Sequence, residues 1–188
     1  MHPDIFLINE TYLKTGSTLF ENIEWKMLQE SVREGSKFIL NVVGTGLYNE
    51  IESQVNDNSI TANTANTTLL NYYIRPCLLY YSIYESVEDI HYKLSPTGLQ
   101  IQQPLSSNPA KESEVDRMKN KYFRKAESKA NDLRKFLIQN STTYPLYNNP
   151  GNGYDTVHPS NRPYDSGMYL GWGNNQKTGY WLRDDGWL

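Results

Sequence analysis

The single cysteine and the three histidines are the side chains best suited to nucleophilic or metal chemistry in this 188-residue chain. A zinc site needs several His or Cys ligands at close spacing, whereas His2, His91 and His158 each stand alone. Cys77 lies in the most apolar stretch, where a buried structural thiol is more common than a reactive thiolate. We therefore predict no metal site, no cofactor and no catalytic cysteine.

Carboxylates and glycine-rich turns are the other chemical candidates. Glu85, Glu88 and Asp89 fall on one face of a predicted helix, where two carboxylates could share acid–base work. No partner motif accompanies them, so a solvated helix end is the preferred interpretation. Residues 44–46, Gly-Thr-Gly, resemble a phosphate-binding turn, but they follow a predicted helix and not a strand, which indicates a helix stop. The sequence contains no catalytic set, and we do not expect an enzyme.

Four basic side chains form the first candidate binding surface. Arg117, Lys121, Arg124 and Lys125 lie within about two and a half turns of a predicted helix, mostly on one face, and we call them the basic stripe. Like charges at this spacing destabilise a helix by about 0.2–0.5 kcal/mol per pair, so an acidic partner would stabilise them. That partner could be the acidic body of a neighbouring subunit or non-specifically bound DNA, and a solvated helix face is the third interpretation.

The C-terminal segment is the second candidate surface. Residues 149–188 hold three of the four tryptophans and seven of the twelve glycines. This composition cannot fill a core of its own, whereas aromatic rings on such a chain can anchor it to another protein. The candidate anchors are Tyr154, Tyr164, Tyr169, Trp172, Tyr180, Trp181 and Trp187. We predict an extended aromatic and Gly-rich arm over residues 148–188, with a tail folded back on its own domain as the alternative.

The rest of the chain shows mostly helical periodicity. Apolar spacing predicts a helix over about residues 24–43, with a weak point in the pattern at Gly35-Ser36, and a shorter helix over 47–55. Residues 56–68 are rich in Asn, Thr and Ser, which predicts an irregular connection. An almost wholly apolar helix follows over residues 68–89 and should be central in the fold, with a kink at Pro76.

The pattern then changes from helical to alternating and back. Apolar and polar residues alternate around a Ser-Pro-Thr-Gly turn, which predicts a β-hairpin near residues 90–103. A regular apolar stripe predicts a long helix over residues 112–139, capped by Ser113 or Ser107. The stripe consists of Val115, Met118, Tyr122, Ala126, Ala130, Leu133 and Leu137. Residues 1–147 thus form a helical body. The predicted fold class is mainly α: a small helical bundle with one β-hairpin and a long extended C-terminal arm.

Charge is distributed unevenly along the chain. Residues 1–109 carry six basic and twelve acidic side chains, whereas residues 110–140 carry nine basic and five acidic ones. An acidic body beside a basic helix suggests that like subunits could dock electrostatically. No apolar run reaches the roughly 20 residues of a membrane span, and we expect no membrane partner. The single cysteine fits a reducing compartment.

Six features in this order carry a resemblance to a known family. They are a helix ending in Val43-Gly44, a short helix at Leu47-Tyr48, a Tyr-rich helix with an internal Pro, a hairpin with Thr97-Gly98, a long charged helix, and Tyr144-Pro145-Leu146-Tyr147. The chain resembles, over about residues 5–147, the head-completion or head–tail connector adaptors of tailed phages, especially the ring proteins of crAss-like phages.

The resemblance implies a structural virion protein that is assembled in the host cytoplasm and located at the portal vertex. Such adaptors form a ring of about twelve copies, join the capsid portal to the tail, extend the DNA channel and support further tail or ring proteins. The C-terminal arm is then expected to bind the portal protein or neighbouring subunits. The basic stripe would face a neighbouring subunit or genomic DNA.

Two other classes of function are consistent with parts of the chain. A carbohydrate- or receptor-binding module could use Trp172, Trp181 and Trp187 as stacking platforms, although this segment supplies little rigid scaffold for them. A hydrolase would need a role for Cys77 or His91 that no motif supports.

Overall fold

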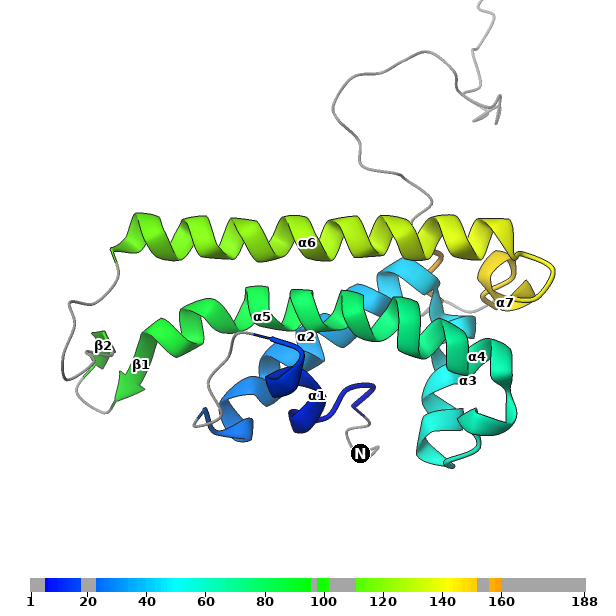
Figure 1. Cartoon of the computed structure of the whole chain (residues 1–188), viewed down its shortest axis with the longest axis horizontal. Helices are drawn as coiled ribbons and strands as arrows, with labels where there is room; N and C mark the ends of the chain where they lie inside the picture. Colours follow the sequence, from blue (N-terminus) through cyan, green and yellow to red (C-terminus); the bar gives the residue numbers. More distant parts are fainter. Residues whose placement is uncertain (1–5, 18–22, 96–97, 102–110, 152–155, 160–188) are drawn as a thin grey trace, which may run out of the picture.

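The computed structural model describes residues 6–17, 23–95, 98–101, 111–151 and 156–159 (Figure 1). Its fold is mainly α, as the sequence predicts. The elements are α1 (Glu10–Thr15), α2 (Trp25–Val43), α3 (Thr45–Asn56), the 3-10 turn η1 (Ile60–Ala62), α4 (Thr64–Leu69), the π-helical turn η2 (Leu70–Ile74), α5 (Arg75–His91), β1 (Tyr92–Ser95), β2 (Gly98–Ile101), α6 (Glu112–Gln139) and α7 (Pro145–Asn148).

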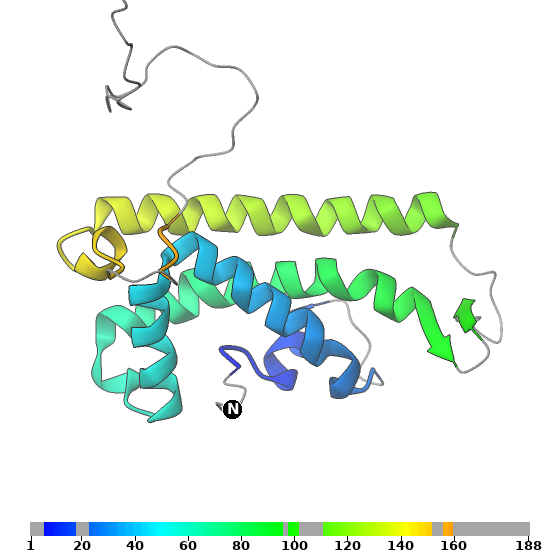
Figure 2. The ribbon, with the colours of Figure 1, turned by 180° about the vertical axis from the view of Figure 1, so that it is seen from behind.

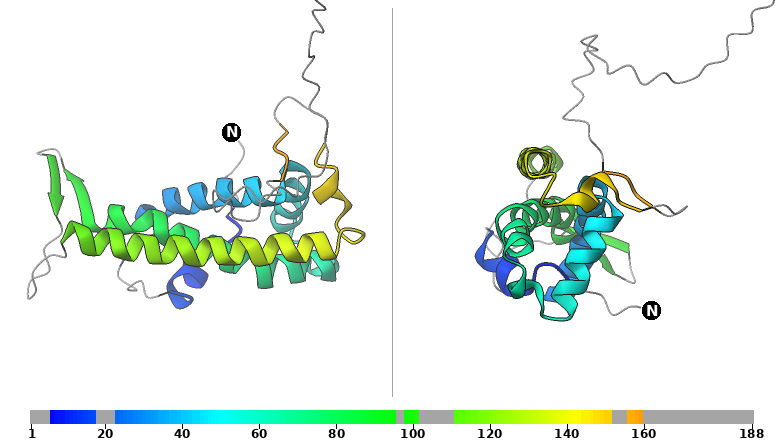
Figure 3. Two further views of the ribbon diagram at one scale, coloured as in Figure 1. Left: turned by 90° about the horizontal axis from the view of Figure 1, so that it is seen from above. Right: turned by 90° about the vertical axis from the view of Figure 1, so that its right-hand side faces the viewer.

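Helix α5 is the central element of the body. Helices α2 and α6 pack against it on different sides and touch each other only slightly. Figure 2 shows α2 crossing α5 at an angle, and the end-on view in Figure 3 shows α6 as a separate rod above α5. The almost wholly apolar composition of α5 follows from this position, since it must bury two faces.

A glycine allows α2 and α5 to approach closely. Gly35 lies in the middle of α2, and a Cβ atom there would lie 2.6 Å from Leu78 Cδ1 and 2.8 Å from Ser82 Oγ, both on α5. The sequence indicated only a weak point in the apolar pattern at this position. Gly35 is instead the residue at which α2 packs closely on α5.

The prediction of an irregular connection over residues 56–68 is partly wrong. Helix α4 begins at Thr64, because the side chain of Asn63 accepts a hydrogen bond from the Asn66 backbone N–H at 3.1 Å and caps the helix. The buried Asn66 amide then donates to Glu50 at 2.8 Å and to Gln54 at 3.0 Å, both on α3. These polar contacts explain how an Asn- and Thr-rich segment can pack as a helix.

The sequence predicted a kink at Pro76 within one long helix. The structure has the π-helical turn η2 between α4 and α5, and Pro76 is the second residue of α5. A wider turn accommodates the missing backbone donor of proline. Arg75 at this junction donates from Nε to the Leu7 carbonyl at 3.0 Å and holds the N-terminal segment on the body. That segment includes the short helix α1, in which Leu13 is buried.

Helix α6 has the predicted bounds but a different cap. The Lys111 backbone N–H donates to the Glu114 side chain at 3.0 Å, and neither predicted serine provides the cap. Ser113 lies inside the helix, and Ser107 lies outside the described residues. The strands β1 and β2 precede α6 and pair antiparallel, with Tyr92 opposite Ile101.

Candidate functional site

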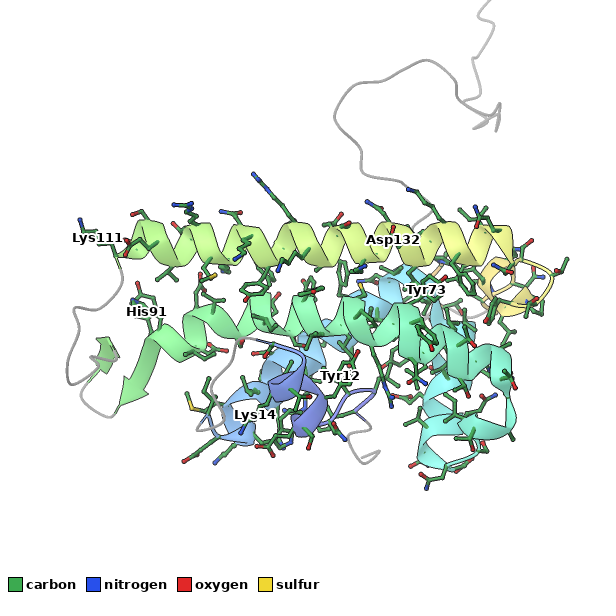
Figure 4. The ribbon with its side chains drawn as sticks, viewed as in Figure 1. Tyr12, Lys14, Tyr73, His91, Lys111 and Asp132 are labelled. Atoms are coloured by element: carbon green, nitrogen blue, oxygen red, sulfur yellow. The ribbon has the colours of Figure 1, made fainter. Side chains whose placement is uncertain are left out.

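Helix α6 presents one face to the body and the opposite face to solvent. Its buried residues are Val115, Tyr122, Ala126, Ala130, Leu133 and Leu137. Met118 belongs to the predicted apolar stripe but is 44 % exposed, because it lies at the edge of the contact with α5. In Figure 4, nitrogen-tipped side chains stand along the edge of α6 that faces away from α5.

The structure divides the predicted basic stripe into two parts. Arg117, Lys121 and Arg124 are exposed on the outer face of α6. The exposed Lys125 lies over two aromatic rings of the body, with Nζ 5.1 Å from the centre of the Tyr80 ring and 5.3 Å from that of Tyr122. Lys121 has one longer contact of this kind, with Nζ 6.0 Å from the centre of the Tyr122 ring. These cation–π contacts occupy the charge of Lys125, whereas within the described part of the chain no ion pair engages Arg117 or Arg124.

Sequence reasoning missed one residue of this surface. Lys135 is exposed and lies eleven residues after Arg124, which brings it back to within roughly 20° of the same helical line. The signal was present in the sequence, because an 18-residue interval from Arg117 to Lys135 is also five turns. We call Arg117, Lys121, Arg124 and Lys135 the outer basic face.

A second feature is a seat for the C-terminal chain at the turn between α2 and α3. The Thr45 backbone N–H donates to the Val157 carbonyl at 3.0 Å, and the Val157 N–H donates to Thr45 Oγ1 at 2.8 Å. We call Gly44, Thr45 and Gly46 the seat. Residues 149–151 and 156–159 therefore begin the predicted arm with a stretch that is held on the body.

Both glycines of the seat leave room for this chain. Gly44 has a φ of +81°, and a Cβ atom there would lie 2.8 Å from Pro159 Cδ. A Cβ atom at Gly46 would lie 2.9 Å from the Pro150 carbonyl oxygen. The predicted helix stop is correct for Gly44, whose N–H donates to Leu40 O at the end of α2, but wrong for Gly46, which lies inside α3.

The predicted aromatic anchors are not placed by the structure. Tyr154, Tyr164, Tyr169, Trp172, Tyr180, Trp181 and Trp187 all lie outside the described residues. Of the C-terminal segment, the structure describes residues 149–151 and 156–159, and these include the contacts with the seat.

The chemical candidates show no catalytic arrangement in the described part of the molecule. Cys77 is fully buried, its thiol donates to the Ala126 carbonyl at 3.6 Å, and burial raises its pKa to about 12. The prediction of a buried thiol is confirmed. Among the described residues no group of His, Cys, Asp and Glu could hold a metal ion.

Comparison with known proteins gives a family but no function. Residues 39–157 match DUF6712, a family of unknown function. The chain belongs to this family. The DUF6712 region includes the seat, the outer basic face and Val157, and it ends before most of the predicted aromatic anchors. No curated protein and no solved structure matches the chain. Within the residues that the structure places, no helix is both long and apolar enough to span a membrane.

Proposed function

We propose that this protein is a structural adaptor that forms a ring with its own copies at the head–tail junction of a tailed phage. In this role the body joins the portal protein to further tail or ring proteins and extends the DNA channel. The resemblance described above gives the virion location and the ring of about twelve copies. The proposed role is structural and requires no cofactor.

The seat is the observation that carries this proposal. Two hydrogen bonds and two close glycine contacts hold Pro150, Val157 and Pro159 at one point on the body, and the segment that contains most of the candidate anchors follows in the sequence. A binding arm benefits from a fixed point of departure, because the anchors then search a smaller volume for their partner. We assign the arm to the portal or to a neighbouring subunit, and the outer basic face to a neighbouring subunit or DNA.

Removal of residues 160–188 tests the role of the arm, because it keeps Pro150, Val157 and Pro159, which contact the seat. We expect the shortened protein to remain helical and to lose association with purified portal protein. Replacement of Trp172, Trp181 and Trp187 by Ala in the full chain should weaken the same association, since buried aromatic anchors dominate many interfaces. Light scattering of each protein alone and with portal measures the association.

Matched controls separate the arm from the body. Tyr72 is an aromatic residue on the body that is 74 % exposed, and Tyr72→Ala should leave portal association unchanged. Normal portal binding by the protein without residues 160–188 would refute the assignment of the arm. Glycan binding by that segment would favour the carbohydrate-binding alternative.

A further inference from the structure

A chain of aromatic rings crosses the body from α2 to α6. Phe38 on α2 stacks on Tyr81 of α5 at a centroid distance of 4.2 Å, and Tyr81 meets Tyr84 at 5.4 Å. Tyr84 then meets Phe123 of α6 at 5.2 Å. These rings are half-buried, and Phe123 is 36 % exposed, so part of the chain of rings reaches the surface.

Carboxylates surround these rings. The Tyr81 hydroxyl donates to Glu85, and Glu34 lies close enough to add to the effect of burial in raising the pKa of Tyr81. Burial and the neighbouring Glu88 and Glu30 raise the pKa of Asp89. Negative charge is therefore concentrated where α2 and α5 meet.

Helix α6 extends this surface. Asp116 is seven residues before Phe123, and Glu127 is four residues after it, so both lie along the Phe123 side of the helix. We call the four rings together with their carboxylates the acidic face. Its carboxylates are Glu30, Glu34, Glu85, Glu88, Asp89, Asp116 and Glu127.

Local cations neutralise only part of this charge. Arg33 pairs with Glu30 at 2.9 Å, Lys37 with Glu34 at 2.5 Å and Lys119 with Glu88 at 2.5 Å. Arg134 lies farther along the same side of α6. Lys26 lies one turn before Glu30 on α2, so among the described side chains seven carboxylates face five cations, and the acidic face remains negative.

We propose that the acidic face receives the outer basic face of a second copy of this chain. The two surfaces have opposite charge and lie on adjoining sides of α6, because Arg117 and Arg124 are roughly 80–120° around the helix from Asp116 and Phe123. A contact between two different surfaces of the same chain is heterologous, and it generates a ring when the rotation closes.

The side-chain types also fit this occupant. Guanidinium groups bind carboxylates through paired hydrogen bonds and stack on aromatic rings, so Arg117 and Arg124 can use both components of the acidic face. DNA would satisfy the outer basic face but would be repelled by the acidic face. A second copy satisfies both surfaces at once.

A complementary exchange of charges tests the inference, which rests on the self-assembly in the proposed function. One double variant, Arg117→Glu with Arg124→Glu, reverses the charge of the outer basic face. The other, Asp89→Lys with Asp116→Lys, reverses charge on the acidic face, and all four positions are exposed. Sedimentation velocity measures association of the full-length protein at low and high salt. Each double variant alone should associate roughly a hundredfold more weakly than the unchanged protein, because like charges then face each other.

An equimolar mixture of the two double variants should regain association, since opposite charges meet again at every contact. Lys111→Glu and Asp57→Lys change charge at exposed positions outside the two faces and should have little effect. Circular dichroism checks folding. If a reversal variant unfolds, Arg117→Gln with Arg124→Gln must still weaken association for the inference to stand.

The outcomes distinguish this inference from the proposed function. If the unchanged protein associates and both double variants associate equally well, self-assembly stands and the assigned faces are wrong. If the Arg variants lose binding to duplex DNA but not association, the outer basic face is a DNA surface and the inference fails. If the unchanged protein stays monomeric with and without portal, both proposals fail.

Discussion

Gly46→Ala should release the C-terminal chain from the body without weakening the body itself. The added Cβ atom would lie 2.9, 3.0 and 3.1 Å from the O, Cα and C atoms of Pro150. These are backbone atoms and cannot rotate away, so Pro150 must move. Gly46 lies in the first turn of α3 and has no positive φ, so alanine favours the helix by up to about 1 kcal/mol.

The size of the effect follows from the contacts at the seat. Two hydrogen bonds join Thr45 to Val157, at 3.0 and 2.8 Å. Each contributes a net of about 0.5–1.5 kcal/mol, so their loss amounts to about 2 kcal/mol. That energy corresponds to a roughly thirtyfold fall in the ratio of held to released chain.

Amide hydrogen exchange measures this ratio directly. The amides of Thr45 and Val157 should exchange roughly thirtyfold faster in Gly46→Ala, whereas those in the middle of α6 should not change. Thr45→Val removes the hydroxyl acceptor and should accelerate Val157, and Thr45→Ser keeps the acceptor and serves as the control. Unchanged exchange at both amides in Gly46→Ala would show that the seat does not hold the chain. A fall of about 2 kcal/mol in the global free energy of unfolding would show that the contacts at the seat are part of the core and do not open locally.

Two further predictions concern the body. Gly35→Ala should lower the free energy of unfolding by about 1 kcal/mol, as measured by urea unfolding. Overpacking against Leu78 and Ser82 costs about 1–3 kcal/mol, and the higher helix propensity of alanine offsets up to about 1 kcal/mol of this. Unchanged stability would contradict the close packing of α2 on α5. The Cys77 thiol, whose pKa burial raises to about 12, should resist alkylation at pH 9 and react only after unfolding, and rapid labelling of the folded protein would contradict its burial.

The sequence predicted the long elements better than the contacts between them. The bounds of α6 could be derived from its periodic stripe, and the central place of α5 from its apolar composition. Helix α4 could not, because it depends on the Asn66 contacts with Glu50 and Gln54 from a separate helix. Local propensity carries no information about such partners.

The candidate surfaces show the same limit. The exposed positions of Arg117 and Arg124 follow from helical spacing, but the engagement of Lys125 depends on where Tyr80 lies on another helix. The seat and the C-terminal residues that it holds are more than one hundred residues apart in the chain. Sequence spacing alone therefore assigned Gly46 to a helix end when its role is contact with Pro150.

The π-helical turn η2 makes the number of residues between Asn66 and Tyr73 a constraint in its own right. Asn66 must face α3, whereas Tyr73 must stack on Phe136 of α6 at 4.0 Å. Each residue added or removed in a helix rotates everything beyond it by roughly 100°. A single-residue deletion in η2 would allow regular α-helical hydrogen bonds locally, but it would misalign one of these two contacts. Insertions and deletions here should therefore be tolerated less well than substitutions.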